Sequence, residues 1–245
     1  MKNKQIKLGL MLVFLLLIAG CMKSTNLAPV INGWLQFNAK SSVYRVKSGD
    51  TIYSIAWAFG LDYRALAAIN NLNPLYSIWP GEILQMTIIA RGQKNTNPPT
   101  RFLVQPSFSR TLLKYWTPHI VRPFSRWHWP AEGRIIQHYS VQMIGGNQGI
   151  DIAGRYGEPV RAAADGIVVY SGSGVRGYGN LIILKHNESY LSAYAFNKRI
   201  LVKEGTKVHL GQKIAQMGHT DAGRVILHFE IRRDGKPVNP LRYLS

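Results

Sequence analysis

The second half of the chain is built from short runs of β-branched and aromatic residues that are bounded by glycine. Four of these runs cover residues 166–170, 181–185, 190–194 and 228–232. Asp234 and Gly235 follow the last run, and this pair is typical of the turn of an antiparallel hairpin. Because helical periodicity is weak throughout residues 127–245, the pattern predicts a mainly antiparallel β domain there.

The N-terminus has the organisation of an export signal over residues 1–20. Three lysines precede an apolar run at residues 8–19, which is shorter than the roughly 20 residues that span a bilayer. Cys21 is the only cysteine of the chain and follows directly after Gly20. This arrangement resembles a bacterial lipoprotein signal, in which Cys21 becomes the lipidated first residue. An ordinary signal peptide that ends at a cysteine is the alternative.

The export signal limits the partners of the protein. The chain carries 30 Lys and Arg against 12 Asp and Glu, and this net charge of +18 would suit nucleic acid. An exported protein does not meet the chromosome, so nucleic acid is excluded as a partner. The resemblance to lipoproteins implies a lipid-anchored protein of the cell envelope. Met22 after the cysteine favours the outer membrane, facing the periplasm of a Gram-negative cell.

Composition divides the mature chain into four parts. Residues 21–42 form the lipidated N-terminus and a polar spacer, and residues 43–90 form a compact module. Residues 91–126 hold seven basic residues, no acidic residue and several prolines, which indicates a basic linker. Residues 127–245 form the β domain. The charge of the linker and the β domain suits anionic lipid headgroups, carboxylate-bearing stem peptides or an acidic partner.

The compact module is expected to fold as strand, helix, helix, strand. A strand at residues 44–46 precedes Thr51, which can cap a helix that Gly60 ends. Asp62 can cap the second helix, and residues 83–88 supply the closing strand. Together with the β domain, this module makes the chain an α+β protein of more than one domain.

The module resembles the LysM family. The motif residues that carry the resemblance are 44–52, 55–56, 69–70 and 80–84. Membership implies binding of N-acetylglucosamine-containing glycans such as peptidoglycan, in a shallow groove between two loops. The implied glycan-binding residues are Gly49, Asp50, Thr51, Asn73, Tyr76 and Trp79. A plain turn and helix cap also explain residues 49–51, and packing also explains the two aromatic side chains.

The β domain resembles the LytM or lysostaphin-type metallopeptidases, whose fold is of the duplicated hybrid motif type. The motif residues are 149–153, 157–168, 177–180, 194–195, 205–208, 211–212 and 227–230. Active members hold zinc with two histidines and one aspartate. They use two further histidines for the catalytic water and the transition state, as an open catalytic zinc site requires.

Only two of these five functional positions keep their residue. Asp151 and His228 are present, whereas Asn147, Phe196 and Ile226 stand where the family has histidine. Two ligands and a neutral amide make a poor zinc site, and no imidazole remains at either position expected for the general base. His138, His186, His209 and His219 stand at other motif positions and are expected to be surface or hydrogen-bonded structural residues. The domain is therefore predicted to be no enzyme and to hold no metal or cofactor. Asp151 and His228 can simply hydrogen-bond within the fold.

The order of lipoprotein signal, LysM module, linker and degenerate LytM domain resembles the NlpD and EnvC type of murein hydrolase activators. This resemblance implies that the degenerate domain activates a periplasmic zinc amidase, an N-acetylmuramoyl-L-alanine amidase, in cell wall remodelling and daughter-cell separation. A groove in place of the active site would hold a regulatory helix of the amidase. The implied groove residues are Asn147, Asp151, Tyr194, Phe196, Ile226 and His228. The alternatives are a structural peptidoglycan-binding lipoprotein and a residual zinc endopeptidase.

Overall fold

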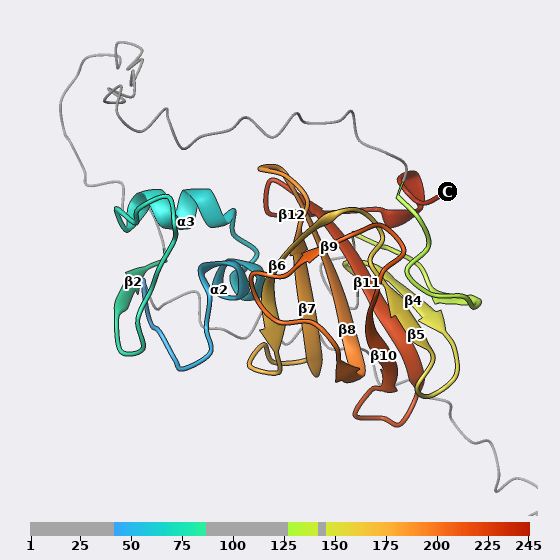
Figure 1. Ribbon diagram of the computed structural model, residues 1–245. Coiled ribbons are helices and arrows are strands. Elements are labelled where there is room, and N and C mark those ends of the chain that lie inside the picture. Colours follow the sequence, from blue (N-terminus) through green and yellow to red (C-terminus); the bar gives the residue numbers. More distant parts are fainter. Residues whose placement is uncertain (1–41, 87–126, 142–145) are drawn as a thin grey trace, which may run out of the picture. The chain divides into compact units, whose positions relative to one another are not determined.

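The computed structural model describes residues 42–86, 127–141 and 146–245 (Figure 1). The expected signal peptide, Cys21, the spacer and the basic linker lie outside these residues. None of the helices in the described ranges is both long enough and apolar enough to cross a membrane.

Residues 42–86, called here the N-terminal module, have the predicted order of elements. Strand β1 (Val43–Arg45) pairs antiparallel with β2 (Ile83–Gln85), and α2 (Ile52–Phe59) and α3 (Tyr63–Ile69) lie between them in the chain. The helices form at these places because the chain supplies their caps. Thr51 and Ser54 make a reciprocal capping box at the start of α2, and Gly60 ends it in the left-handed conformation.

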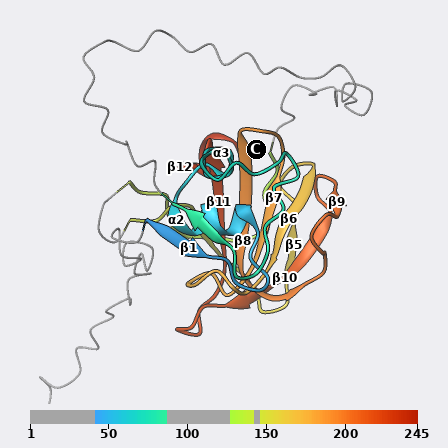
Figure 2. The same cartoon turned by 90° about the vertical axis from the view of Figure 1, so that its left-hand side faces the viewer.

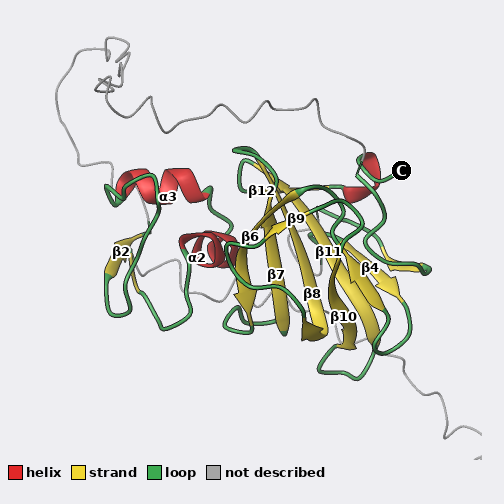
Figure 3. Ribbon diagram, in the orientation of Figure 1, coloured by secondary structure: helices red, strands yellow, loops and turns green. Residues whose placement is uncertain are grey.

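Residues 127–245, called here the C-terminal domain, form one antiparallel sheet (Figure 3). Its strands are β3 (Ile135–Gln137), β4 (Ile150–Ala153), β5 (Pro159–Arg161), β6 (Gly166–Gly172), β7 (Asn180–Lys185), β8 (Tyr190–Ile200), β9 (Lys207–Val208), β10 (Lys213–His219), β11 (Val225–Arg233) and β12 (Lys236–Val238). A short 3-10 helix, Pro240–Arg242, follows the last strand. Neighbouring strands pair in the order β3, β4, β11, β10, β8, β7, β6, β9. The predicted α+β fold with a mainly antiparallel β domain is confirmed.

The central strands of this sheet are buried on both faces. Along β11, Leu227, Phe229 and Ile231 point into a core that the C-terminal domain builds from its own residues. Ile226 points the other way, because successive side chains of a strand alternate between faces. The strands β6 and β7, which pair along their length, lie side by side in both views (Figures 1 and 2). The second face of β11 carries the side chains of functional interest.

Candidate functional site

His228 lies at the centre of a buried polar network on β11. The strand register places His228 opposite Asp151 of β4. The imidazole Nδ1 lies 2.6 Å from Asp151 Oδ1, and Nε2 lies 3.0 Å from Glu230 Oε1. Burial by itself would lower the pKa of His228, but the hydrogen bonds to Asp151 and Glu230 and the charges of these carboxylates outweigh it and raise this pKa to about 10. His228 is therefore an imidazolium that donates to both carboxylates at neutral pH.

The network continues from Glu230 to Arg232. Burial raises the pKa of Glu230, but Arg232 and His228 lower it more, so the net result is a pKa of about 2. The Arg232 Nε donates to Glu230 Oε2 over 3.1 Å, and the Tyr178 hydroxyl donates to Glu230 Oε1. Asp151, His228, Glu230 and Arg232 thus alternate in charge. Each buried charge has an opposite partner, and removing one partner would leave an uncompensated buried charge.

These residues do not fit a catalytic zinc ion. A zinc-ligating histidine needs a free lone pair on one ring nitrogen, and both nitrogens of His228 are engaged with carboxylates. Asn147 Oδ1 accepts weakly from the Gly149 N–H at 3.4 Å, and Asn147 Nδ2 has no hydrogen-bond partner among the described residues. Within the described ranges, no group of three or more His, Cys, Asp or Glu side chains is arranged to hold a metal. Asp151 and His228, which stand at zinc-ligand positions of the family, are instead part of a hydrogen-bonded network of charges.

The structure brings Asp151, Phe196, Ile226 and His228 of the predicted groove residues together and separates Tyr194 from them. Asn147 contacts Ser140 and Gly149. Tyr194 belongs to the core on the opposite face of the sheet, and its hydroxyl accepts from the Ala163 N–H over 2.8 Å. It does not lie beside His228, because the neighbouring strand β8 turns alternate residues to opposite faces. All six residues are buried: Asn147 6%, Asp151 1%, Tyr194 0%, Phe196 8%, Ile226 1% and His228 7% exposed. As described, this region is closed and is not an open groove.

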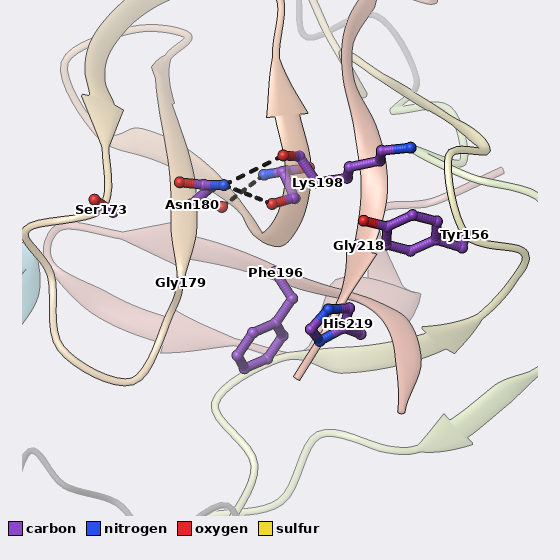
Figure 4. A pocket seen from close by; sticks show the side chains of 9 residues that line it. Tyr156, Ser173, Gly179, Asn180, Phe196, Lys198, Gly218 and His219 are labelled. Carbon is purple, nitrogen blue, oxygen red and sulfur yellow. Dashed lines mark hydrogen bonds between the residues drawn. The ribbon is translucent and has the colours of Figure 1, made fainter. Parts of the chain in front are cut away.

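An open pocket of about 270 Å³ lies next to Phe196 (Figure 4). Lys198 contributes its Nζ, 4.3 Å from the ring centre of Tyr156, and Tyr156 stacks on His219. Phe196 has a φ of 60°, an uncommon value for a residue that is not glycine. Gly218 permits the close approach of strand β10, because a Cβ at Gly218 would lie 2.6 Å from the Phe196 carbonyl oxygen. The pocket combines the Lys198 cation with aromatic side chains. Phe196 borders both the pocket and the region around His228, because its ring centre lies 6.3 Å from that of His228.

In the N-terminal module, the first predicted glycan loop is built as a turn and a helix cap. Asp50 accepts from the Tyr44 hydroxyl and from the Lys47 N–H, each over 2.8 Å. Thr51 accepts from the Ser54 N–H as a cap. Its own hydroxyl donates to the Val169 carbonyl of the C-terminal domain over 3.1 Å. This loop is therefore structured by contacts inside the protein, whatever it binds.

The second predicted glycan loop presents one exposed and one packed aromatic residue. Trp79 is 73% exposed, so its ring face is accessible to a sugar. Tyr76 instead packs edge-on against Tyr53 and Tyr63, with ring centres 6.1 and 5.5 Å away. Asn73 closes a local turn by accepting from the Leu75 N–H over 3.0 Å. Trp79 is the aromatic residue best placed for stacking.

Sequence reasoning missed three residues of the network around His228. Glu230 and Tyr178 lie within the motif segments 227–230 and 177–180, but no role was predicted for either. Arg232 follows Glu230 by two positions on the same strand, so it faces the same side. Strand alternation around His228 is the signal that could have identified Glu230 and Arg232.

Comparison with known families agrees with the two-part architecture. The LysM domain model matches residues 44–87, and the peptidase family M23 model matches residues 145–240. The N-terminal module is a LysM domain and the C-terminal domain is an M23 peptidase-like domain. Together they define a class of LysM proteins with an M23-type domain.

Curated relatives identify the family within this class. The lipoprotein NlpD/LppB homolog of Pseudomonas aeruginosa is 46% identical over 230 residues, covering 83% of this chain and 77% of the relative. The murein hydrolase activator NlpD of Escherichia coli is 40% identical, covering 83% and 68%. The uncharacterized lipoprotein YgeR of Escherichia coli is 39% identical, covering 100% and 94%. The chain belongs to the NlpD family of envelope lipoproteins.

Proposed function

We propose that the protein activates a periplasmic N-acetylmuramoyl-L-alanine amidase and is itself no enzyme. One observation carries the proposal: His228 is held between Asp151 and Glu230, while Phe196 and Ile226 stand in the histidine positions of an M23 peptidase. A domain that has kept its fold but lost its reactive groups is suited to binding a partner protein. The name of the Escherichia coli relative, murein hydrolase activator, supports this role.

The proposed activator works at the cell wall because of its other parts. Residues 1–20 direct export, Cys21 carries the lipid, and residues 21–42 and 91–126 act as spacer and basic linker. The LysM domain holds the protein on peptidoglycan, with Trp79 as a stacking surface and Gly49, Asp50, Thr51 and Asn73 in the adjoining loops. We place the lipid anchor in the outer membrane, and the activity in cell wall remodelling and daughter-cell separation.

In this proposal the amidase docks on the region around Phe196, Ile226 and His228. The pocket beside Phe196 receives a side chain of the amidase, and Lys198 favours an acidic or polar group there. Once exposed, the apolar side chains of Phe196 and Ile226 suit the apolar face of an amphipathic helix. No step of the proposed mechanism uses a metal on this chain, because activation consists of binding alone.

The test is the release of dye from labelled sacculi by a zinc amidase of the same organism. The mature protein is expected to increase dye release above that of the amidase alone, and to release none by itself. If dye release does not rise, the protein is a structural peptidoglycan-binding lipoprotein. If one zinc ion per chain co-purifies and Asp151→Ala abolishes it, the residual zinc endopeptidase is the correct alternative.

Phe196→Glu tests the docking region. A carboxylate in place of this ring should reduce activation at least about tenfold, because an apolar contact at the centre of an interface is replaced by a charge. Sacculus binding should be unchanged, since the LysM domain is untouched. Ile167→Glu is the matched control, because it adds the same charge to the same domain at a site that is 41% exposed. Equal activation by both variants would contradict the proposed docking region, provided that both melt cooperatively.

A further inference from the structure

The LysM domain packs against the same sheet face that bears His228. We infer that this contact is autoinhibitory, because it prevents the amidase from binding there. In this inference, the LysM domain must leave the face before the amidase can occupy it. The inference rests on the proposed activator function and adds its regulation.

Arg232 connects the two domains through hydrogen bonds and a ring contact. Its side chain is 2% exposed, and its Nη1 donates to the carbonyl oxygen of Trp57 in α2 over 2.8 Å. The guanidinium also lies over the Trp57 ring, 3.8 Å from its centre. On the other side, Nη2 donates to Gln148 Oε1 over 2.7 Å, next to Asn147, and Nε donates to Glu230. A helix of the LysM domain is therefore connected through one side chain to the residues that surround His228.

Polar contacts at the edges fix the orientation of the LysM domain on this face. The Tyr63 hydroxyl donates to Glu188 Oε2 over 2.9 Å, and Thr51 bonds to the Val169 carbonyl. Arg64 forms an ion pair of 2.8 Å with Asp234. These contacts reach β6, the connection between β7 and β8, and the hairpin that follows β11. The contacts of Tyr63 and Arg64 lie close together, because the Asp234 N–H donates to the Ser189 carbonyl oxygen, and the contact of Thr51 with Val169 is a separate one. Together with Arg232, these contacts give the interface a defined geometry.

The apolar contact between the domains extends as far as the proposed docking region. Ile52, Ile55 and Trp57 of the LysM domain belong to one continuous hydrophobic cluster with Phe196 and Ile226. The side chains of His228, Phe196 and Ile226 are all less than 9% exposed. A partner cannot contact side chains that are buried to this degree, so the arrangement described here is closed. In the inference, the LysM domain supplies part of what closes it.

One glycine allows this close contact. Gly235 lies in the turn after β11, and a Cβ on it would lie 2.6 Å from the Asp62 backbone nitrogen and 2.7 Å from the Leu61 carbonyl oxygen. Backbone atoms cannot move aside as a flexible side chain can, so a methyl group here must push the domains apart. Gly223 is the matched control: it has the same φ of +76° as Gly235 and no atom within 4 Å of its Cβ position. Alanine strains the backbone equally at both glycines, but it disturbs the interface at only one of them.

The experiment compares the mature chain with Gly235→Ala and Gly223→Ala by hydrogen exchange and by amidase activation. Gly235→Ala should exchange faster in residues 52–65 and 226–236 and should raise dye release from sacculi about tenfold, as expected when a mostly closed population opens. Gly223→Ala should match the wild type in both measurements. Tyr63→Phe, which removes only the bond to Glu188, should shift both measurements in the same direction by a smaller factor.

Three results would overturn the inference. Unchanged hydrogen exchange in Gly235→Ala would mean that the domains are not in contact there. Faster exchange with the dye release of the wild type would mean that the contact exists but does not control access, and the proposed function would stand. If neither wild type nor any variant raised dye release, the proposed function would fail and the inference with it.

Discussion

Two histidines of the C-terminal domain make hydrogen bonds through both ring nitrogens, yet their pKa values move in opposite directions. His228 lies between two carboxylates, which raise its pKa to about 10. His186 lies between neutral groups, with Nδ1 at 2.7 Å from the Asp165 carbonyl oxygen and Nε2 at 2.7 Å from Ser192 Oγ. Burial lowers the pKa of His186 to about 4, although its hydrogen bond to Asp165 acts in the other direction. The charge of the partners decides which form of the ring is stable.

His186 should make the fold sensitive to acid. Its folded pKa of about 4 lies below the ordinary value of 6.5, so between these pH values the unfolded chain binds more protons than the folded one. The contribution to stability is complete above pH 6.5 and is lost as the pH falls toward 4. Urea unfolding at pH 7 and pH 4.5 should show a drop in the free energy of unfolding that is smaller in His186→Gln by on the order of 1 kcal/mol. An equal drop in both proteins would contradict this assignment.

At the scale of elements, local signals predicted the N-terminal module well. Thr51, Gly60 and Asp62 bound the two helices where their caps were expected, because a cap depends on residues three or four positions away. Strand β2 ends at Gln85, earlier than the predicted strand at 83–88. In the sheet, β8 continues well beyond residue 194 to Ile200, past the positive φ of Phe196. Its length is set by pairing with β7, β10 and β11, which a local pattern does not contain.

The cap of α2 gives a prediction at this scale. Thr51→Ala removes the side chain that accepts from the Ser54 N–H and the hydroxyl that bonds to Val169. We expect it to lower the free energy of unfolding by about 1 kcal/mol, the usual cost of losing an N-cap. Thr51→Ser keeps both hydrogen bonds and should stay close to the wild type in urea unfolding. Two variants of equal stability would show that the capping box contributes nothing measurable.

At the scale of the whole molecule, the sequence predicted the parts of the candidate site but not their surroundings. Motif spacing singled out Asp151 and His228, and the structure places His228 Nδ1 2.6 Å from Asp151 Oδ1. The contact between Arg232 and Trp57 joins residues 175 positions apart, and neither residue belongs to a site motif. No periodicity, cap or spacing rule connects residues at such a separation. The burial of the sheet face that bears His228 therefore could not be predicted from the sequence.

Both loops predicted to bind glycan border the interface between the domains. Thr51 of the first loop bonds to Val169, and Tyr76 of the second packs on Tyr63, which bonds to Glu188. If release of the LysM domain frees these loops, opening and glycan binding must favour each other by the same factor. Gly235→Ala should therefore bind a chitin oligosaccharide more tightly than Gly223→Ala in calorimetric titration. Equal affinities of the two variants would show that glycan binding is not coupled to the opening of the domains.

The close approach at Gly235 also has a consequence for how relatives of this chain can diverge. The turn of residues 234 and 235 abuts the backbone of residues 61 and 62 with no room for one added carbon. A longer turn in one domain therefore requires a compensating change in the other. We expect insertions after β11 to occur in relatives only together with altered residues between α2 and α3. Sequence changes in the two domains are thus expected to be coupled. Replacing either domain with the equivalent domain of a distant relative should break the contact between them.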